Sequence, residues 1–327
     1  MKSFLRLFML LIVLAGLVVY FFFLKPYGPS TETFVDIPAG AGSAGIASRL
    51  EQGGVIRSRY AFWAMRKVHG GVLHAGEYRF DGPVPLATVY ARIVKGDVYT
   101  RTLVIPEGYN IFDIAGAAEK AGLGKAADFL ATARRDTRLV ADLSPHAPSL
   151  EGFLFPDTYR FSRHTTPDLM VAAMVKRFRQ VAGQLGLAQS PDVARTVTMA
   201  SLVEKEVRVD AERPVVAGVF TNRIAQGIPL ATDPSVIYAA LLDGRWRGTI
   251  YRSDLDSESV YNTYRHAGLP PSPIANPGVA ALKAAMNPAK TDYLYFVADA
   301  NGSTRFSVDL KEHNEQVQAY RAAERGK

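Results

Sequence analysis

The N-terminal segment constrains this chain most, because residues 7–24 (LFMLLIVLAGLVVYFFFL) form an uncharged apolar run. A membrane-spanning helix needs about 20 such residues, whereas a cleaved signal peptide has an apolar stretch of about 7 to 15 followed by a small-residue cleavage site. This run instead ends in the segment Tyr20–Leu24, whose aromatic residues are typical of a membrane interface. The pattern favours an uncleaved transmembrane anchor, with a cleaved signal peptide as the alternative.

The charges around the run indicate the orientation of the anchor. Lys2 and Arg6 precede it, and basic residues are typical of the cytoplasmic end of a membrane helix. Lys25 on the far side weakens this asymmetry. We therefore expect residues 1–26 to form a cytoplasmic stub and a single-pass anchor, with the rest of the chain on the outer face of the membrane.

The composition excludes several kinds of chemistry. The chain has no cysteine, which excludes disulfides, thiolate metal sites and a cysteine nucleophile. Its formal net charge of +7 is too small to indicate a nucleic-acid partner, so none is expected. The histidines are scattered without metal-ligand spacing, and residues 40–42 (GAG) lack the Lys-Ser/Thr ending of a phosphate-binding loop. We expect neither a metal nor a cofactor.

Behind the anchor, strand and helix patterns alternate. Proline, glycine and small polar residues predict a linker over residues 27–33. A small α/β region is predicted over residues 34–100, with strands at 34–38 and 76–80 and helices at 42–52, 58–67 and 85–95. A similar pattern predicts a strand from residue 102 and a helix over 110–121. Residues 101–148 are therefore predicted to form a second strand–helix unit. It indicates either a weak internal repeat or a common strand–turn–helix entry.

The second half of the chain is mainly helical in pattern. Helices are predicted over residues 166–187, 191–208, 213–226 and 234–242. The tail predicts a strand over 293–298, a turn over 299–302, a strand over 305–308 and a helix from residue 310. Residues 101–327 therefore read as a mixed α+β domain with a helical core and a small sheet, and the fold class of the whole chain as α+β.

One predicted helix carries a carboxylate on its apolar side. The segment 190–208 (SPDVARTVTMASLVEKEVR) offers Ser190 as N-cap, and helical geometry places Glu204 in a stripe with Val197 and Ala200. A carboxyl group among apolar neighbours loses hydration, which favours its protonated form and suits a general acid. The alternative is that Glu204 pairs with a cation or lines a solvated groove. Glu206 lies well round from the stripe and is expected to be solvated.

Other polar residues allow two interpretations each. Asp233 precedes a proline-led helix as an N-cap would, and Asp157 resembles an ordinary turn residue. Glu151 fits a loop beside a pocket or a surface turn. Residues 261–278 combine tyrosines, asparagines and prolines, a mixture that suits sugar binding but also a rigid packing loop.

At these residues the chain resembles the endolytic murein (peptidoglycan) transglycosylase family, of the YceG-like or MltG type. The resemblance covers nearly all of the chain after the anchor, and the order and spacing of its segments make it specific. The agreeing segments are 150–159 (LEGFLFPDTY), 200–206 (ASLVEKE), 219–223 (VFTNR), 229–238 (PLATDPSVIY), 261–271 (YNTYRHAGLPP), 276–278 (NPG) and 293–298 (YLYFVA).

The resemblance implies an enzyme of the bacterial envelope that cuts glycan strands internally at the bond between N-acetylmuramic acid and N-acetylglucosamine. It implies an inner-membrane anchor, a LysM-like region over residues 34–100, a periplasmic catalytic domain over 101–327, and Glu204 as the acid and base that leaves a 1,6-anhydro end. It also implies substrate-binding residues in the groove, namely Glu151, Asp157, Tyr159, Asn222, Asp233, Tyr261, Asn262 and Tyr264. The family often has a histidine in its final strand where this chain has Thr304, so the resemblance supports no catalytic histidine there.

The resemblance implies peptidoglycan glycan strands as the substrate, and peptidoglycan synthases (penicillin-binding proteins) as protein partners. Two rival functions stay open from the sequence. A hydrolase of the same polymer would need a second carboxylate, such as Asp157 or Asp233, to activate water. A glycan-binding scaffold without catalysis would need no acid at all.

Overall fold

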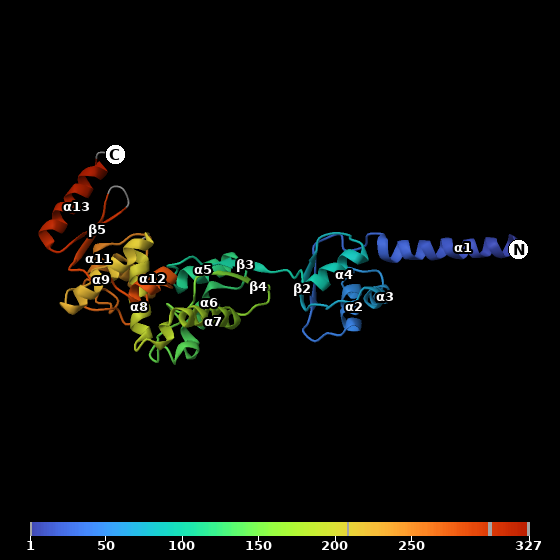
Figure 1. Cartoon of the computed structure of the whole chain (residues 1–327), viewed down its shortest axis with the longest axis horizontal. Helices are drawn as coiled ribbons and strands as arrows, with labels where there is room; N and C mark the ends of the chain where they lie inside the picture. The colour runs from blue at the N-terminus through green and yellow to red at the C-terminus, as the bar shows by residue number, and fades with distance from the viewer. Residues whose placement is uncertain (1, 208, 300–302, 326–327) are drawn as a thin grey trace. The chain divides into compact units, whose positions relative to one another are not determined.

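The computed structural model describes residues 2–207, 209–299 and 303–325 and divides the chain into two units, Met1–Arg101 and Thr102–Lys327 (Figure 1). The chain begins with helix α1 (Lys2–Val19), which continues as a π-helical turn, η1 (Tyr20–Leu24). Residues Phe4–Leu24 form one helix long and apolar enough to cross a membrane. The predicted apolar anchor segment is therefore helical throughout.

The first unit is a small strand–helix–helix–strand arrangement followed by one more helix. Its elements are β1 (Thr33–Ile37), α2 (Ser43–Gln52), α3 (Arg59–His69), β2 (Gly76–Phe80) and α4 (Leu86–Lys95). The strands pair antiparallel, from Thr33 opposite Phe80 to Ile37 opposite Gly76. Ser58 caps α3 by accepting hydrogen bonds from two backbone N–H groups, as its side chain predicts.

The end of the anchor belongs to the core of this first unit. Phe22 and Phe23 pack against the buried cluster that contains Phe62 and Tyr78. The segment expected to be a linker is also fastened, because Tyr27 and Val84 exchange two backbone hydrogen bonds of 3.1 Å each. The end of the apolar helix and the segment after it thus contact the folded unit on both sides of Lys25.

The second unit is mainly helical, with short strands. Its first half contains β3 (Arg101–Val104), α5 (Ile111–Lys120), α6 (Ala126–Arg135), η2 (Thr137–Val140), β4 (Thr158–Phe161), α7 (Pro167–Leu185) and η3 (Leu187–Gln189). Its second half contains α8 (Val193–Glu206), η4 (Asp210–Glu212), α9 (Arg213–Ala225), α10 (Asp233–Leu242), α11 (Arg252–Leu255), α12 (Val279–Met286), β5 (Tyr295–Ala298), β6 (Thr304–Ser307) and α13 (Leu310–Arg325). The described residues form three two-stranded sheets, β1–β2, β3–β4 and β5–β6. A mixed α+β fold with small sheets is confirmed.

Several local expectations need correction. Helix α8 begins at Val193 with Asp192 as its N-cap, whose carboxylate accepts the Arg195 N–H at 2.8 Å, so Ser190 is not the cap. Asp233 is the first residue of α10 and Thr232 is its N-cap. Helices α6 and α12 were not expected. The predicted turn over 299–302 lies largely outside the described residues.

Helix α8 is the central element of the second unit. It packs against α9, α10 and α12, and Val197 and Ala200 are completely buried, which confirms the predicted apolar stripe. The helix ends at Glu206, where the next residue adopts an extended backbone. Both glutamates of its Glu-Lys-Glu end therefore lie where α8 leaves the core.

Candidate active site

The two glutamates at the end of α8 have different surroundings. Residues two positions apart on a helix point about 200° apart, so Glu204 and Glu206 face opposite sides. Glu204 Oε1 lies 2.8 Å from Arg213 Nη1, and Glu204 Oε2 accepts the Gly278 N–H at 2.9 Å. The side chains of Glu204 and Arg213 are 5% and 6% exposed. The alternative in which Glu204 pairs with a cation is the one found.

Glu107 lies against this ion pair. A Cβ on Gly278 would collide with Glu107 Oε1, so the carboxyl group packs directly on that glycine at the start of α12. Burial and, next, the charge of Glu204 raise the pKa of Glu107. Lys205 Nζ donates to the Gly108 carbonyl at 3.2 Å, which ties the loop of Glu107 to the end of α8.

Glu206 faces a cavity on the other side of α8. The cavity has a volume of about 360 Å³ and is lined, among others, by Glu206, Arg223, Asp233, Tyr264, Tyr295 and His313. Glu206 is half-buried rather than solvated, which corrects the expectation from the helix alone. Burial and then the negative charge of Asp233 raise the pKa of Glu206 to about 7. A carboxyl group with such a pKa can both give and take a proton near neutrality.

Asp233 and Tyr264 also line the cavity and are hydrogen-bonded to each other. The Tyr264 hydroxyl donates to Asp233 Oδ1 at 2.8 Å, and Tyr264 is 41% exposed. The backbone that carries Asp233 is fixed by Thr263, whose carbonyl accepts the Ala231 N–H at 3.0 Å and whose Oγ1 accepts the Thr232 N–H at 2.9 Å. Ala231 adopts a left-handed backbone with φ of 53°, a strained conformation for a residue with a side chain. This part of the cavity lining is therefore held in one geometry.

Arg223 and His313 complete the polar lining. Arg223 Nη1 donates to the Leu230 carbonyl at 2.7 Å, while its Nε is buried and has no hydrogen-bond partner among the described residues. Burial and then the charge of Arg223 lower the pKa of His313, which favours the neutral imidazole. The His313 ring stacks on Tyr295, with centroids 5.2 Å apart. The cavity thus offers a proton donor, a carboxylate, a cation and aromatic surface, which together suit a sugar.

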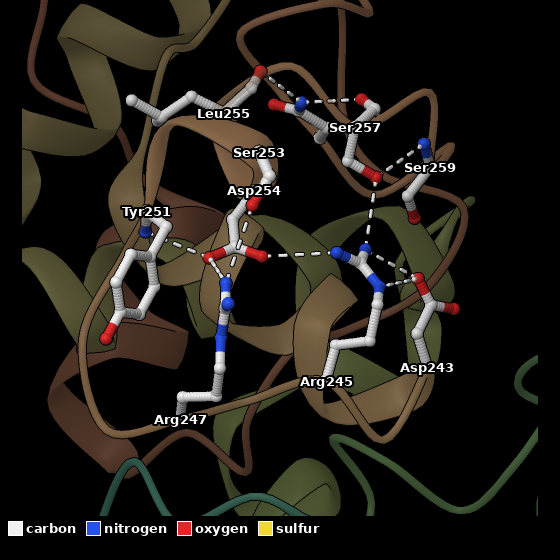
Figure 2. Close-up of polar contacts among 10 residues, drawn as sticks. Asp243, Arg245, Arg247, Tyr251, Ser253, Asp254, Leu255, Ser257 and Ser259 are labelled. Atoms are coloured by element: carbon white, nitrogen blue, oxygen red, sulfur yellow. Dashed lines mark hydrogen bonds and ion pairs between the residues drawn. The ribbon is translucent and has the colours of Figure 1, made fainter.

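A polar cluster fixes the loop that returns the chain from α10 to the cavity. Asp254 lies between Arg245 Nη1, 3.2 Å from its Oδ1, and Arg247 Nη2, 3.3 Å from its Oδ2 (Figure 2). Asn262 then donates to the Leu255 and Ser257 carbonyls at 2.9 and 2.7 Å. Asn262 Oδ1 accepts the Tyr264 N–H at 3.1 Å, so this asparagine positions Tyr264 and is itself completely buried.

Of the expected groove residues, the structure brings Asp233 and Tyr264 together at the cavity. Tyr261 is buried, with its hydroxyl 2.6 Å from Ser272 Oγ, and Asn222 donates to the Thr291 and Tyr293 carbonyls. Tyr159 donates to the Phe155 carbonyl at 2.6 Å, and Asp157 pairs with Arg177 at 2.7 Å. Within the described part of the chain, these four residues do not line the cavity.

Glu151 lies in the interior, so its interpretation as a surface turn is wrong. Its Oε2 accepts the Ile111 N–H at 2.9 Å, and its Oε1 accepts Asn276 Nδ2 at 2.8 Å. Burial raises the pKa of Glu151 to about 8. The side chain is enclosed by protein, and it connects the start of α5 to Asn276 in the loop before α12.

The sequence did not predict that Glu206, Arg223, Tyr295 and His313 line this cavity. Arg223 and Tyr295 lie in segments that resemble the family, and this resemblance is the sequence feature that could have indicated them. Glu206 stands in the same Glu-Lys-Glu segment as Glu204, and the choice between the two needed the positions of Arg213 and Asp233 in space.

Comparisons with known proteins agree on one family. The model of the YceG-like family matches residues 35–319 of this chain. A protein of Bacillus subtilis (strain 168) named endolytic murein transglycosylase is 34% identical over 319 residues, which cover 91% of this chain and 88% of that protein. A protein of the same name from Streptococcus pneumoniae serotype 2 is 30% identical, over 86% of this chain and 57% of its own length. The crystal structure of a yceG-like protein from Listeria monocytogenes is similar with a TM-score of 0.58 at 32% identity, covering 88% of this chain and 99% of that one.

Proposed function

The chain belongs to the YceG-like family, and on that premise we propose that it is a membrane-anchored endolytic murein transglycosylase, a lyase that cuts peptidoglycan glycan strands internally. The observation that carries the proposal is the cavity in which Glu206, with its pKa raised to about 7, faces Asp233 and Tyr264. Its volume, about 360 Å³, lies in the range of pockets that bind small ligands.

Glu206 is the acid and base of the proposed reaction. As an acid it protonates the oxygen between N-acetylmuramic acid and N-acetylglucosamine, and the bond from that oxygen to muramoyl C1 breaks. As a base it then takes the proton of the muramoyl C6 hydroxyl, whose oxygen bonds to C1 and closes a 1,6-anhydro ring. Water is neither consumed nor released, and the glutamate ends in the protonation state in which it began.

Glu204, the residue expected from helix spacing, is proposed to hold the end of α8 rather than to transfer the proton. Both of its oxygens are occupied, one by the Arg213 guanidinium and the other by the Gly278 N–H. These two contacts connect the Glu204 carboxyl group to the starts of α9 and α12.

Asp233 and Tyr264 are proposed to act on the sugar. Cleavage of a glycosidic bond passes through a transition state with positive charge on the ring, which the nearby Asp233 carboxylate stabilises. The Tyr264 hydroxyl orients that carboxylate through its 2.8 Å hydrogen bond. The same carboxylate is what a hydrolase would use to activate water, so hydrolysis is the rival outcome of the test.

The location follows from the anchor. We propose that residues 7–24 span the inner membrane, with Lys2 and Arg6 on the cytoplasmic side and the catalytic unit in the periplasm. The first unit is the proposed LysM-like region. At that location the enzyme meets new glycan strands, so peptidoglycan synthases are its proposed protein partners and termination of strand growth its proposed effect.

The test is digestion of uncrosslinked peptidoglycan by the full chain in lipid nanodiscs, with product masses as the readout. Internal fragments with 1,6-anhydro ends, absent with Glu206→Gln, are expected. Products heavier by one water would make the protein a hydrolase. Intact strands with the unaltered chain would favour a non-catalytic glycan-binding scaffold.

A further inference from the structure

Helix α3 has a face that the first unit does not bury. Tyr60 is 77% exposed and Trp63 is 51% exposed, although the same helix buries three side chains in the core, those of Ala61, Phe62 and Met65. Lys67 Nζ lies 5.3 Å from the centroid of the Trp63 ring. Tyr60, Trp63 and Lys67 follow each other at spacings of three and four residues, so they share one side of the helix. We name these three residues the α3 aromatic face.

The start of α3 contacts the end of the membrane-spanning helix. The Arg57 guanidinium carbon lies 4.3 Å from the centroid of the Phe21 ring and 4.5 Å from that of the Tyr27 ring. Arg57 Nη2 also donates to the Pro26 carbonyl at 3.4 Å. Helix α3 begins two residues later, at Arg59. Since a helix rises 1.5 Å per residue, Trp63 lies within about two turns of the contact with the anchor.

The contact is fixed by a shared core. Phe22 and Phe23 of η1 pack against the buried cluster to which Phe62 of α3 also belongs. Turning α3 away from the anchor would therefore open that core. The α3 aromatic face keeps a constant position relative to the end of the anchor.

The charge of the unit suits an anionic surface. Residues 25–101 contain ten lysines and arginines and six aspartates and glutamates, which gives a net charge of +4. Arg59, Arg66 and Lys67 are all on α3. Basic residues within a Debye length of an anionic leaflet are attracted to it, and tryptophan and tyrosine are enriched at the level of the lipid headgroups.

We propose that the α3 aromatic face binds the surface of the membrane in which the anchor sits, with Trp63 and Tyr60 among the headgroups of anionic phospholipids. The partner is the lipid surface itself. The proposal rests on the membrane anchor of the proposed function but is independent of the reaction at Glu206.

The test uses the two tryptophans of the chain, Trp63 and Trp246. The full-length Trp246→Phe variant, in which Trp63 is the remaining tryptophan, is placed in nanodiscs of anionic phospholipid with and without bromine on the acyl chains. Bromine quenches tryptophan at close range, so Trp63 emission is expected to fall about twofold or more in the brominated discs. The Trp63→Phe variant, which reports Trp246 outside α3, is the reference for unspecific quenching.

Two comparisons make the result decisive. Adding Tyr60→Glu and Lys67→Glu to the Trp246→Phe variant is expected to reduce the quenching of Trp63, and so is replacing anionic by zwitterionic lipid. Trp63 emission quenched no more than that of Trp246 would overturn the proposal. Co-elution of the chain with the discs tests the anchor separately. If the chain stays with the discs while Trp63 is unquenched, only the proposal for the α3 aromatic face is contradicted. If the chain does not enter the discs, both the proposed anchor and this proposal are contradicted. The proposed reaction is tested by the digestion assay alone.

Discussion

Arg213 Nη1 lies 2.8 Å from Glu204 Oε1 in a buried ion pair. Glu204 precedes Glu206, which faces the cavity, by two residues. The ion pair ties the last turn of α8 to the first residue of α9. Asp210, a much more exposed second partner, lies 2.9 Å from Arg213 Nε. The two glutamates of one short segment thus take two roles, one in holding the helix end and one in the proposed chemistry.

Glu206→Gln is expected to abolish most of the activity without unfolding the protein. A glutamine cannot give or take the proton, and loss of a general acid lowers the rate by about 10²–10⁴-fold. The measurement is kcat/KM for release of 1,6-anhydro ends, with thermal unfolding as the control for folding. Unchanged activity in this variant would remove Glu206 from the mechanism.

Glu204→Gln is the matched substitution and is expected to act through stability. It leaves the Arg213 charge buried with only Asp210 as partner, and breaking a buried pair in this way costs about 3 kcal/mol. Denaturant unfolding measures the loss, and the folded fraction of the variant should keep its activity. A fully folded Glu204→Gln protein without activity would return the acid role to Glu204.

Tyr264→Phe is expected to lower kcat/KM about tenfold. It removes the hydrogen bond to Asp233, and bonds to charged groups contribute about 1.5–3 kcal/mol. The neighbouring Tyr261→Phe is the control, because its hydroxyl bonds Ser272 in the interior. That control should lower the unfolding free energy by about 1 kcal/mol and leave the folded enzyme active. Equal effects of both substitutions on activity would contradict the arrangement.

Activity is expected to fall as the pH rises through about 7, because the reaction starts with protonated Glu206 and the pKa of Glu206 is raised to about 7. The charge of Asp233 contributes to that raised pKa, after burial. Asp233→Asn removes a negative neighbour and should therefore move the alkaline limb of the residual activity to lower pH. A pH profile of kcat/KM for both proteins checks the shift, and a limb that stays in place would exclude coupling between the two carboxyl groups.

Stability is expected to depend on pH through Glu151, whose pKa is raised to about 8 from the usual 4.5. Between these two values the folded protein binds a proton that the unfolded chain has lost, so the unfolding free energy falls as the pH rises from about 5 to 8. Glu151→Gln is always neutral and should show a flatter dependence, with a difference on the order of 3 kcal/mol across this interval. Parallel curves for the two proteins would mean that Glu151 is ionised in the fold.

Local signals predicted the elements better than the site. Ser58 and Asn110 cap the helices that they were expected to begin, because a cap depends only on the next three residues. Helix periodicity also placed Val197 and Ala200 in the core. The same arithmetic could not separate Glu204 from Glu206, since it describes one helix by itself. The proposed assignment to Glu206 rests on Arg213, Gly278, Asp233 and Tyr264, which come from other segments of the chain.

Some polar residues that could act in catalysis or binding have a structural role instead. Glu151 and Asn262 are polar residues in family-like segments, and both are completely enclosed and hydrogen-bonded to backbone groups. Burying a polar group costs free energy unless each bond is replaced, so such residues support loops as effectively as they bind ligands. Only the three-dimensional arrangement distinguishes these two uses.

Phe22 and Phe23 lie at the boundary between the apolar N-terminal helix and a hydrophobic core. Proteolytic release of the chain after its apolar run would strip two aromatic rings from that core and leave apolar surface facing water. Secretion as a free enzyme and correct folding of the first unit are therefore in conflict. The aromatic end of the proposed anchor is therefore part of the folded core as well as of the apolar helix.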